Sequence, residues 1–233
     1  MRCLVVLLAL SSVAFAQRGG GGGGGAGGGG RRQLYVPDPT NRQHVRECQN
    51  RIIHQRGDSN YFYSWRHPRT RDEKVDWLDA RNICRRHCMD LVSLETPQEN
   101  NLIRNVIETD RIPYIWTSGR KCDFGGCDRA DLKPTIVNGW FWSGSGAKIF
   151  PSNRRFAGTW SHTGGARRPQ PDNREPTDGS GFGEQESCIA ILNNFYNDGV
   201  VWHDVGCSHK KHFVCEDSKE LINFVQSRAR VQL

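Results

Sequence analysis

Apolar residues recur at helical spacing in four separate stretches of this chain. One helix is predicted over residues 73–88, where Trp77, Ala80 and Cys84 at i, i+3 and i+7 share one face. Another is predicted over 96–109, because its Thr-Pro-Gln-Glu start is a capping box with proline at the first helical position. The other two stretches are 40–55, with Val45, Cys48 and Ile52 at i, i+3 and i+7, and the C-terminal tail, with Leu221, Phe224 and Val225 at i, i+3 and i+4.

Short runs of β-branched and aromatic residues predict strands in the second half of the chain. Residues 189–192 and 200–202 are strand-like and are separated by an Asn-Asp-Gly turn, and 211–215 is predicted to complete the sheet. Few regular elements are expected from 143 to 183. An irregular stretch of this length is uncommon and is generally functional.

The N-terminal region is predicted to carry a targeting signal and a flexible segment. Residues 1–16 combine a basic start, an apolar run and an Ala-Phe-Ala cleavage pattern, which is typical of a secretory signal peptide. The apolar run is shorter than the roughly 20 residues of a membrane span, so we expect a secreted, extracellular protein without membrane insertion. Residues 17–39 contain eleven glycines between Gly19 and Gly30 and are predicted to be a flexible linker, followed by a helical extension over 40–56.

The chain is basic. The precursor has a net charge of +7, and removing Arg2 with the signal leaves 31 basic against 25 acidic residues, or +6. Such an excess favours acidic partners, including sulfated glycans of an extracellular matrix, and no nucleic-acid-binding motif accompanies it. Residues 56–59 read Arg-Gly-Asp-Ser, a known integrin-binding tetrapeptide, although a Gly-Asp-Ser turn before a strand at Tyr61 explains the same residues.

The cysteine content predicts disulfide bonds. Removing the signal takes Cys3 with it, so that eight of the nine cysteines remain. An even number in a secreted chain implies disulfides, and spacing alone leaves 105 pairings. Cys122 and Cys127 are close enough in sequence to close a local loop. The spacings lack the CxxC pairs of a structural zinc site.

Polar residues and cysteines between 169 and 216 form the most specific pattern in the chain. The pattern is Gln170-Pro171-Asp172, Glu186 two residues before Cys188, Trp202-His203-Asp204 before Cys207, and Phe213-Val214-Cys215-Glu216. Together with the Trp-x-x-Ala-x-x-x-Cys spacing of the first predicted helix, this combination resembles the C-type lectin-like domain family. The glycine-rich N-terminal segment looks like that of small secreted insect C-type lectins.

The resemblance implies an α+β fold over residues 57–217, with two helices, twisted antiparallel sheets, a long ligand loop and disulfide staples. It implies the pairs Cys84–Cys215 and Cys188–Cys207, which beside a local Cys122–Cys127 bond leave Cys48 for Cys88. Residues 218–233 form a tail that can contain a short helix. We expect no enzymatic activity, because no nucleophile accompanies His203 and Asp204, and adjacent strand residues point to opposite faces.

The resemblance also implies a calcium site that binds carbohydrate. The residues assigned to the ion and to the sugar are Gln170, Asp172, Glu186, Asp204 and, in the place of an expected asparagine, His203. Pro171 is expected to follow a cis peptide bond that turns the two neighbouring side chains toward the ion. Two adjacent sugar hydroxyls would coordinate calcium directly. The order Gln-Pro-Asp implies glycans with galactose-type hydroxyls, since an unmatched buried donor or acceptor costs about 1 to 3 kcal/mol.

Two residues depart from the family pattern. The imidazole of His203 suits zinc or copper better than calcium, so the calcium affinity is expected to be reduced. Arg174 follows Asn173 in a place where galactose binders of the family commonly carry an aromatic residue. The alternative function is therefore a structural or adhesion protein of a cuticle-like extracellular matrix, which uses the same scaffold to contact matrix proteins or acidic glycans.

Overall fold

The two central helices lie within the stretches that the sequence pattern predicts, although the one predicted over 73–88 is shorter and runs from Trp77 to Arg86. In the computed structural model, α2 (Trp77–Arg86) buries the predicted apolar face. The α3 helix (Pro97–Thr109) starts with the predicted capping box: the Thr96 hydroxyl accepts from the Glu99 amide at 3.2 Å, and the Glu99 carboxylate accepts from the Thr96 amide at 3.1 Å. Local caps and apolar periodicity therefore account for both helices.

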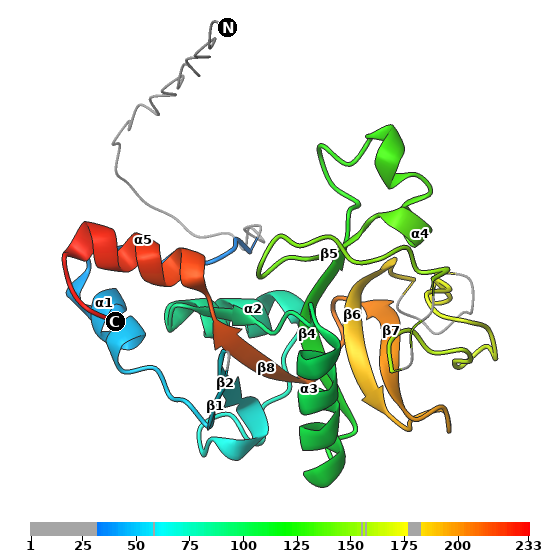
Figure 1. Cartoon of the computed structure of the whole chain (residues 1–233), viewed down its shortest axis with the longest axis horizontal. Coiled ribbons are helices and arrows are strands. Elements are labelled where there is room, and N and C mark those ends of the chain that lie inside the picture. Colours follow the sequence, from blue (N-terminus) through cyan, green and yellow to red (C-terminus); the bar gives the residue numbers. More distant parts are fainter. Residues whose placement is uncertain (1–31, 58, 155, 157, 177–182) are drawn as a thin grey trace, which may run out of the picture. The chain divides into compact units, whose positions relative to one another are not determined.

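The structure describes residues 32–57, 59–154, 156, 158–176 and 183–233. The predicted signal peptide, the glycine-rich tract and the aspartate of the Arg-Gly-Asp sequence lie outside the described residues. Residues Gln33–Leu233 form one compact unit, whose described residues are drawn in colour in Figure 1. Among the described helices none is both long and apolar enough to span a bilayer.

Eight strands form a mixed sheet in the order β1-β2-β8-β4-β6-β7, with β3 beside β8 and β5 beside β4. Their bounds are β1 (Gln55–Arg56), β2 (Asn60–Tyr63), β3 (Met89–Leu91), β4 (Tyr114–Lys121), β5 (Trp140–Trp142), β6 (Glu186–Asn193), β7 (Val200–Gly206) and β8 (His212–Asp217). The β4 and β8 strands are parallel, which differs from the expected antiparallel arrangement. Parallel neighbours need a long connection, and the three strands β5, β6 and β7 lie between them in the chain.

Buried tryptophans fill the space between the sheet and the irregular segment that follows β5. Trp142 and Trp202 lie with ring centroids 5.2 Å apart, and Trp160 lies 5.1 Å from Trp140 and 6.0 Å from Trp202. All four are at most 5% exposed. Such edge-to-face contacts anchor this segment, so its backbone can present side chains at a fixed place on β6 and β7.

Four disulfides join the described elements: two are the pairs that the resemblance implies, one closes the local loop expected from sequence proximity, and one joins the two cysteines that remained. Their cysteines are Cys48–Cys88, Cys84–Cys215, Cys122–Cys127 and Cys188–Cys207. The second links α2 to β8, and the fourth links β6 to the residue that follows β7. The two strands that carry candidate ligands are thus covalently tied next to those ligands.

The N-terminal and C-terminal helices lie side by side (Figure 1). The α1 helix (Arg42–Gln49) contributes Cys48 and Val45 to an apolar cluster, and α5 (Lys219–Ala229) contributes Leu221 and Val225. The C-terminal helix predicted from its apolar spacing is thus present. Shorter helical turns are η1 (Ser64–Arg66), η2 (Ala130–Leu132) and α4 (Thr135–Asn138).

Two N-terminal expectations differ from the structure. The helix predicted over 40–55 ends at Gln49, and Ile52 is 41% exposed, so this residue does not belong to a buried helical face. The end of the predicted linker lies against α2: the Tyr35 amide donates to the Asn82 side chain at 2.7 Å, and Arg85 donates to the Tyr35 carbonyl at 2.6 Å. The expectation of a flexible tether is wrong for this part because α2 offers partners for its backbone.

Candidate functional site

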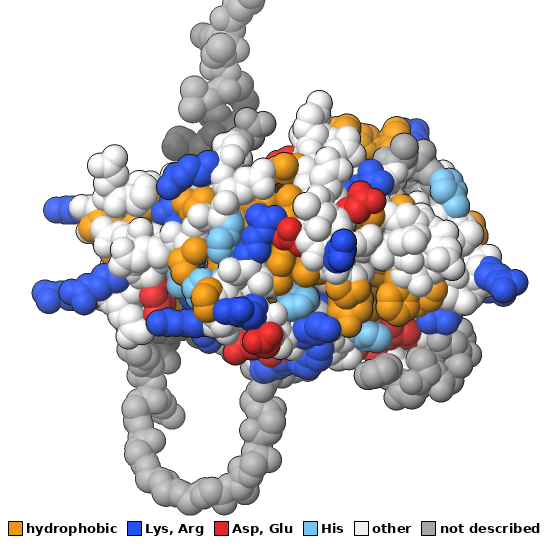
Figure 2. Space-filling model, turned by 90° about the horizontal axis from the view of Figure 1, so that it is seen from below, with side chains coloured by type: hydrophobic (Ala, Val, Ile, Leu, Met, Phe, Trp, Pro, Cys, Tyr) orange, Lys and Arg blue, Asp and Glu red, His pale blue; other side chains and the backbone are white. Residues whose placement is uncertain are grey.

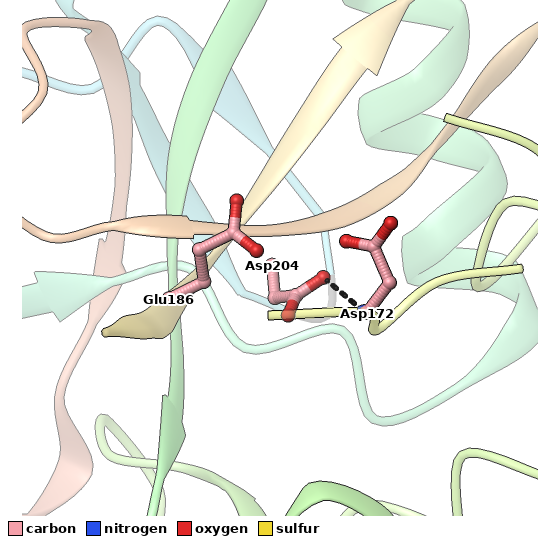
Figure 3. A group of neighbouring side chains, drawn as sticks. All are labelled: Asp172, Glu186 and Asp204. Carbon is pink, nitrogen blue, oxygen red and sulfur yellow. Dashed lines mark hydrogen bonds between the residues drawn. The ribbon is translucent and has the colours of Figure 1, made fainter. Parts of the chain in front are cut away.

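Three carboxylates from distant parts of the chain converge at one place. Asp172 comes from the irregular segment, Glu186 is the first residue of β6, and Asp204 lies on β7. One carboxylate oxygen from each lies within 4.8 Å of the others. Figure 3 shows the Asp204 side chain between the other two. The antiparallel pairing of β6 with β7 brings Glu186 and Asp204 together, and the loop adds Asp172.

Backbone amides of the loop hold these carboxylates in place. The Asp204 carboxylate accepts from the Asp172 amide at 3.0 Å and from the Asn173 amide at 2.8 Å. Glu186 accepts from the Arg174 amide, and its own amide donates to the Asn173 side chain at 2.9 Å. Asn173 has a positive φ of 48°, which asparagine tolerates better than most residues. The loop and the two strands are therefore held by reciprocal hydrogen bonds.

Burial and mutual repulsion make the ionised forms of these carboxylates unfavourable in the absence of a cation. Burial and, after it, the neighbouring Asp204 carboxylate together raise the pKa of Glu186 to about 8. Burial also raises the pKa of Asp204 to about 7, although the amides of Asn173 and Asp172 oppose that shift. One oxygen of Asp172 is buried and has no hydrogen-bond partner among the described residues. A hard divalent cation fits such a group because it accepts several carboxylate oxygens at once.

Gln170 lies in the same cavity as the carboxylates. Its side chain is 3% exposed, and its amide nitrogen lies 3.5 Å from the carbonyl oxygen of Arg168. The peptide bond between Gln170 and Pro171 is cis. Gln170, Asp172, Glu186 and Asp204 thus line one cavity.

His203 does not join the converging ligand atoms. Its Nε2 lies 2.9 Å from an oxygen of Asp198, and both side chains are buried. The Ser161 hydroxyl donates to the same Asp198 oxygen at 2.6 Å. Burial lowers the pKa of His203, and the carboxylate of Asp198 opposes this shift. The imidazole therefore anchors the buried carboxylate of Asp198. Among the described residues, the converging ligand atoms are carboxylate oxygens.

A cavity of about 300 Å³ opens beside the carboxylates. Its lining includes the aromatic residues Tyr114, Phe195 and Tyr196 and the buried Lys211. Burial lowers the pKa of Lys211 to about 8, and the carboxylate of Glu175 opposes that shift. The cavity therefore offers apolar surface, acceptors and donors close together, which is the mixture that small-molecule sites require.

Sequence patterns missed two residues of this site. Asp198 and Tyr196 fall in the segment between the two predicted strands, where Asn-Asp-Gly indicates only a surface turn. The turn extends over the six residues between β6 and β7, and it returns toward the cavity. No local signal distinguishes an exposed turn residue from one that meets a distant loop.

The chain is similar in sequence to a curated protein and resembles several solved structures. No model of a known protein family matches the chain. The C-type lectin mosGCTL-7 of Culex quinquefasciatus is 26% identical over 146 residues, which are 61% of this chain and 69% of that protein. The solved complex of SPL-1 with GlcNAc has a TM-score of 0.48 and 21% identity, and the match covers 74% of this chain and 96% of that one.

Two further solved structures are similar. The Kupffer cell C-type lectin receptor Clec4f has a TM-score of 0.46 and 17% identity, covering 75% of this chain and 88% of that one. The lectin TC14 of the tunicate Polyandrocarpa misakiensis has a TM-score of 0.44 and 19% identity, covering 68% and 97%. The mosquito relative, the motif spacing and the disulfide-stapled α+β architecture together support one conclusion: this chain is similar to the C-type lectins.

Proposed function

We propose that this chain is a calcium-dependent carbohydrate-binding protein. The observation that carries the proposal is the convergence of the Asp172, Glu186 and Asp204 carboxylates within 4.8 Å. Calcium takes six to eight oxygen ligands, and three carboxylates with a neighbouring amide match that preference. Gln170 lines the same cavity and supplies the amide. When bound, calcium would supply positive charge and open coordination positions for two adjacent sugar hydroxyls.

The sugar proposed for this site carries galactose-type hydroxyls. Gln170 and Asp172 place an amide before a carboxylate on either side of Pro171. An amide can donate a hydrogen bond and an ionised carboxylate can only accept one, so their order sets which hydroxyl donates and which accepts. Reversing the order would leave a mismatch that costs about 1 to 3 kcal/mol, which supports a preference between sugars that differ at one hydroxyl.

The proposed location is outside the cell. Four disulfides are expected to persist in an oxidising compartment, where they would hold the ligand strands together. Lys and Arg side chains are spread across the face seen in Figure 2, with acidic side chains in a few places between them. This face and the net charge of +6 that remains after the predicted signal is removed suit acidic glycans of an extracellular matrix as additional partners.

Chromatography on immobilised galactose tests the lectin function. The expected result is retention in calcium and release by a chelator, with Glu186→Gln passing through the column unretained. The matched control is Glu184→Gln, since Glu184 binds the Cys207 and Ser208 amides and is not one of the three converging carboxylates. Retention that a chelator leaves unchanged contradicts the proposal, and so does the absence of retention on galactose in calcium.

A second candidate function is that of a matrix or adhesion protein that does not bind sugar through calcium. The observation that favours it is the hydrogen bond between His203 and Asp198. Because of this bond, His203, which stands where the family pattern has an asparagine, adds no ligand atom to the converging group. Binding to heparin-agarose that persists in chelator and is released by salt is expected for this alternative, because salt screens interactions between exposed charges.

A further inference from the structure

Another cavity, with a volume of about 150 Å³, lies between α2 and the paired strands β2 and β8 (Figure 1). It shares no lining residue with the cavity beside the three carboxylates. Its apolar wall consists of Ile83 and Cys84 from α2, Phe62 from β2, Met89 from β3 and Cys215 from β8. An apolar cavity of this volume stays dry and can hold a group of the size of benzene.

Three sulfur-containing residues contribute to this wall. Met89 is 1% exposed, and the disulfide between Cys84 and Cys215 joins α2 to β8 at the cavity. Sulfur is polarizable and makes favourable contacts with aromatic rings. The ring of Phe62 lies on the same wall, and a second ring can pack against it edge-on or offset. The wall therefore favours an aromatic group over an aliphatic chain.

The polar residues at the cavity are basic or neutral. His67, Arg69 and Thr70 come from the turn after η1, and His87 follows the last residue of α2. No aspartate or glutamate is among the described residues that line this cavity. The Nδ1 atom of His67 is buried and has no hydrogen-bond partner among the described residues. A guanidinium beside imidazoles, without a carboxylate, is complementary to an anion.

Hydrogen bonds hold the turn that carries these polar residues. The amides of Thr70 and Arg71 donate to the His67 carbonyl at 3.0 Å and 2.9 Å, and the Thr70 hydroxyl donates to the Ser64 carbonyl at 2.6 Å. Ile52, on the segment between α1 and β1, also lines the cavity and is 41% exposed. The early end of α1 thus leaves an apolar side chain at the cavity. The site is preformed, and preformed sites lose less entropy when a ligand binds.

We propose that this cavity binds a small aromatic carboxylate, with the ring against the sulfur-containing wall and the carboxylate at Arg69 and His67. The planar guanidinium of arginine matches the two oxygens of a carboxylate, and an imidazole nitrogen that carries a proton donates to one of them. The ring needs no hydrogen bonds and buries apolar surface. This site is separate from the converging carboxylates, so the inference stands independently of the proposed binding of calcium and sugar.

Nuclear magnetic resonance of the isotope-labelled full chain, titrated with phenylacetate at neutral pH, tests the proposal. We expect saturable shifts of the Thr70, Ile83 and Met89 amide signals, with a Kd of about 1 mM or lower. 2-Phenylethanol keeps the ring without the carboxylate and should bind about two- to fivefold more weakly. Hexanoate keeps the carboxylate without the ring and should bind about two- to tenfold more weakly.

Each titration has an outcome that contradicts part of the proposal. Shifts that do not saturate, or that spread over residues away from the cavity, overturn the site. Equal affinity for 2-phenylethanol overturns the role of the carboxylate, and equal affinity for hexanoate overturns the preference for an aromatic ring.

Variants locate the ligand within the cavity. Arg69→Gln should weaken phenylacetate binding about two- to fivefold. The matched control is Arg71→Gln, which should leave the affinity unchanged because the exposed Arg71 does not line the cavity. Ile83→Phe adds volume to the wall and should abolish the saturable shifts. Calcium affinity, measured by calorimetry, should be the same in all variants and the parent.

A surface variant covers the case in which Ile83→Phe fails to fold. Ile52→Glu places a negative charge beside the cavity at a residue that is 41% exposed, and it should weaken phenylacetate binding about two- to fivefold by repulsion. Unchanged affinity in both Arg69→Gln and Ile52→Glu overturns the proposed site. An equal loss in Arg69→Gln and Arg71→Gln overturns the assignment of Arg69, because it indicates general attraction of anions to the basic turn.

Discussion

Replacing Glu186 by glutamine is expected to have opposite effects on the calcium-free and the calcium-loaded protein. Glu186 is 5% exposed, and its carboxylate lies within 4.8 Å of two others. At an effective dielectric constant of about 20, two ionised carboxylates at that distance repel each other by roughly 3 kcal/mol. Glutamine removes this repulsion and can still accept the hydrogen bond from the Arg174 amide. In chelator at pH 9 we therefore expect Glu186→Gln to be about 1 to 3 kcal/mol more stable than the parent.

The sign of this effect depends on pH. The folded-state pKa of Glu186 is raised to about 8, mainly by burial, from an ordinary value near 4.5. The stability that its protonated form contributes is complete below pH 4.5 and is lost as the pH rises through 8. The advantage of the glutamine variant in chelator should therefore be small at pH 4.5 and should grow up to pH 9. Urea unfolding at several pH values, followed by tryptophan fluorescence, measures this difference.

Calcium should reverse the order of stability. A ligand at 1,000 times its Kd stabilises the folded parent by about 4.1 kcal/mol, and Glu186→Gln should lose most of that gain. The control Glu184→Gln should keep the calcium-dependent gain, since Glu184 lies outside the group of three carboxylates. Equal stabilisation of the parent and of Glu186→Gln by calcium would refute the reasoning. A glutamine variant that is less stable than the parent in chelator at pH 9 would refute the electrostatic part.

Three further predictions concern the surroundings of the site and the fold. His203→Ala leaves the carboxylate of Asp198, whose side chain is 4% exposed, without its ring donor; urea unfolding should show a loss of about 2 to 3 kcal/mol, and a loss below about 0.5 kcal/mol would contradict this role. Burial raises the pKa of Glu216 to about 8, so Glu216→Gln should gain thermal stability over the parent as the pH rises from 4.5 to 8, and a Tm difference independent of pH would contradict it. Replacing Cys48 and Cys88 together by serine opens a loop with a sequence separation of 40 and should cost about 4 kcal/mol in denaturant unfolding; an unchanged midpoint would count against that bond.

Much of the secondary structure could be predicted because its signals are local. The capping box at Thr96 satisfies amide groups within one turn, and proline at the next position favours the same backbone conformation. The face of α2 follows from three apolar residues at helical spacing. The parallel pairing of β4 with β8 has no such signal, because it depends on where the intervening strands pass.

The candidate site was predictable only in part, because its contacts also depend on segments that are distant in the sequence. Asp172, Glu186 and Asp204 stand at motif spacing, and the structure brings their carboxylates together. His203 stands at motif spacing too, yet its ring nitrogen meets Asp198, which comes from the preceding turn. Motif spacing specifies which residues can reach the site, whereas the partner of each side chain depends on segments that the motif does not contain.

The sequence by itself determined the apolar face of α2, the start of α3, the strands that carry the ligands and the residue types able to bind a hard cation, because caps, periodicity and side-chain chemistry act over a few residues. Tertiary structure alone decided that α1 and α5 share an apolar cluster, that His203 anchors Asp198, and that Tyr196 returns to the carboxylates. Each of these contacts depends on the packing of surrounding elements and on the burial of polar groups, which no local pattern specifies.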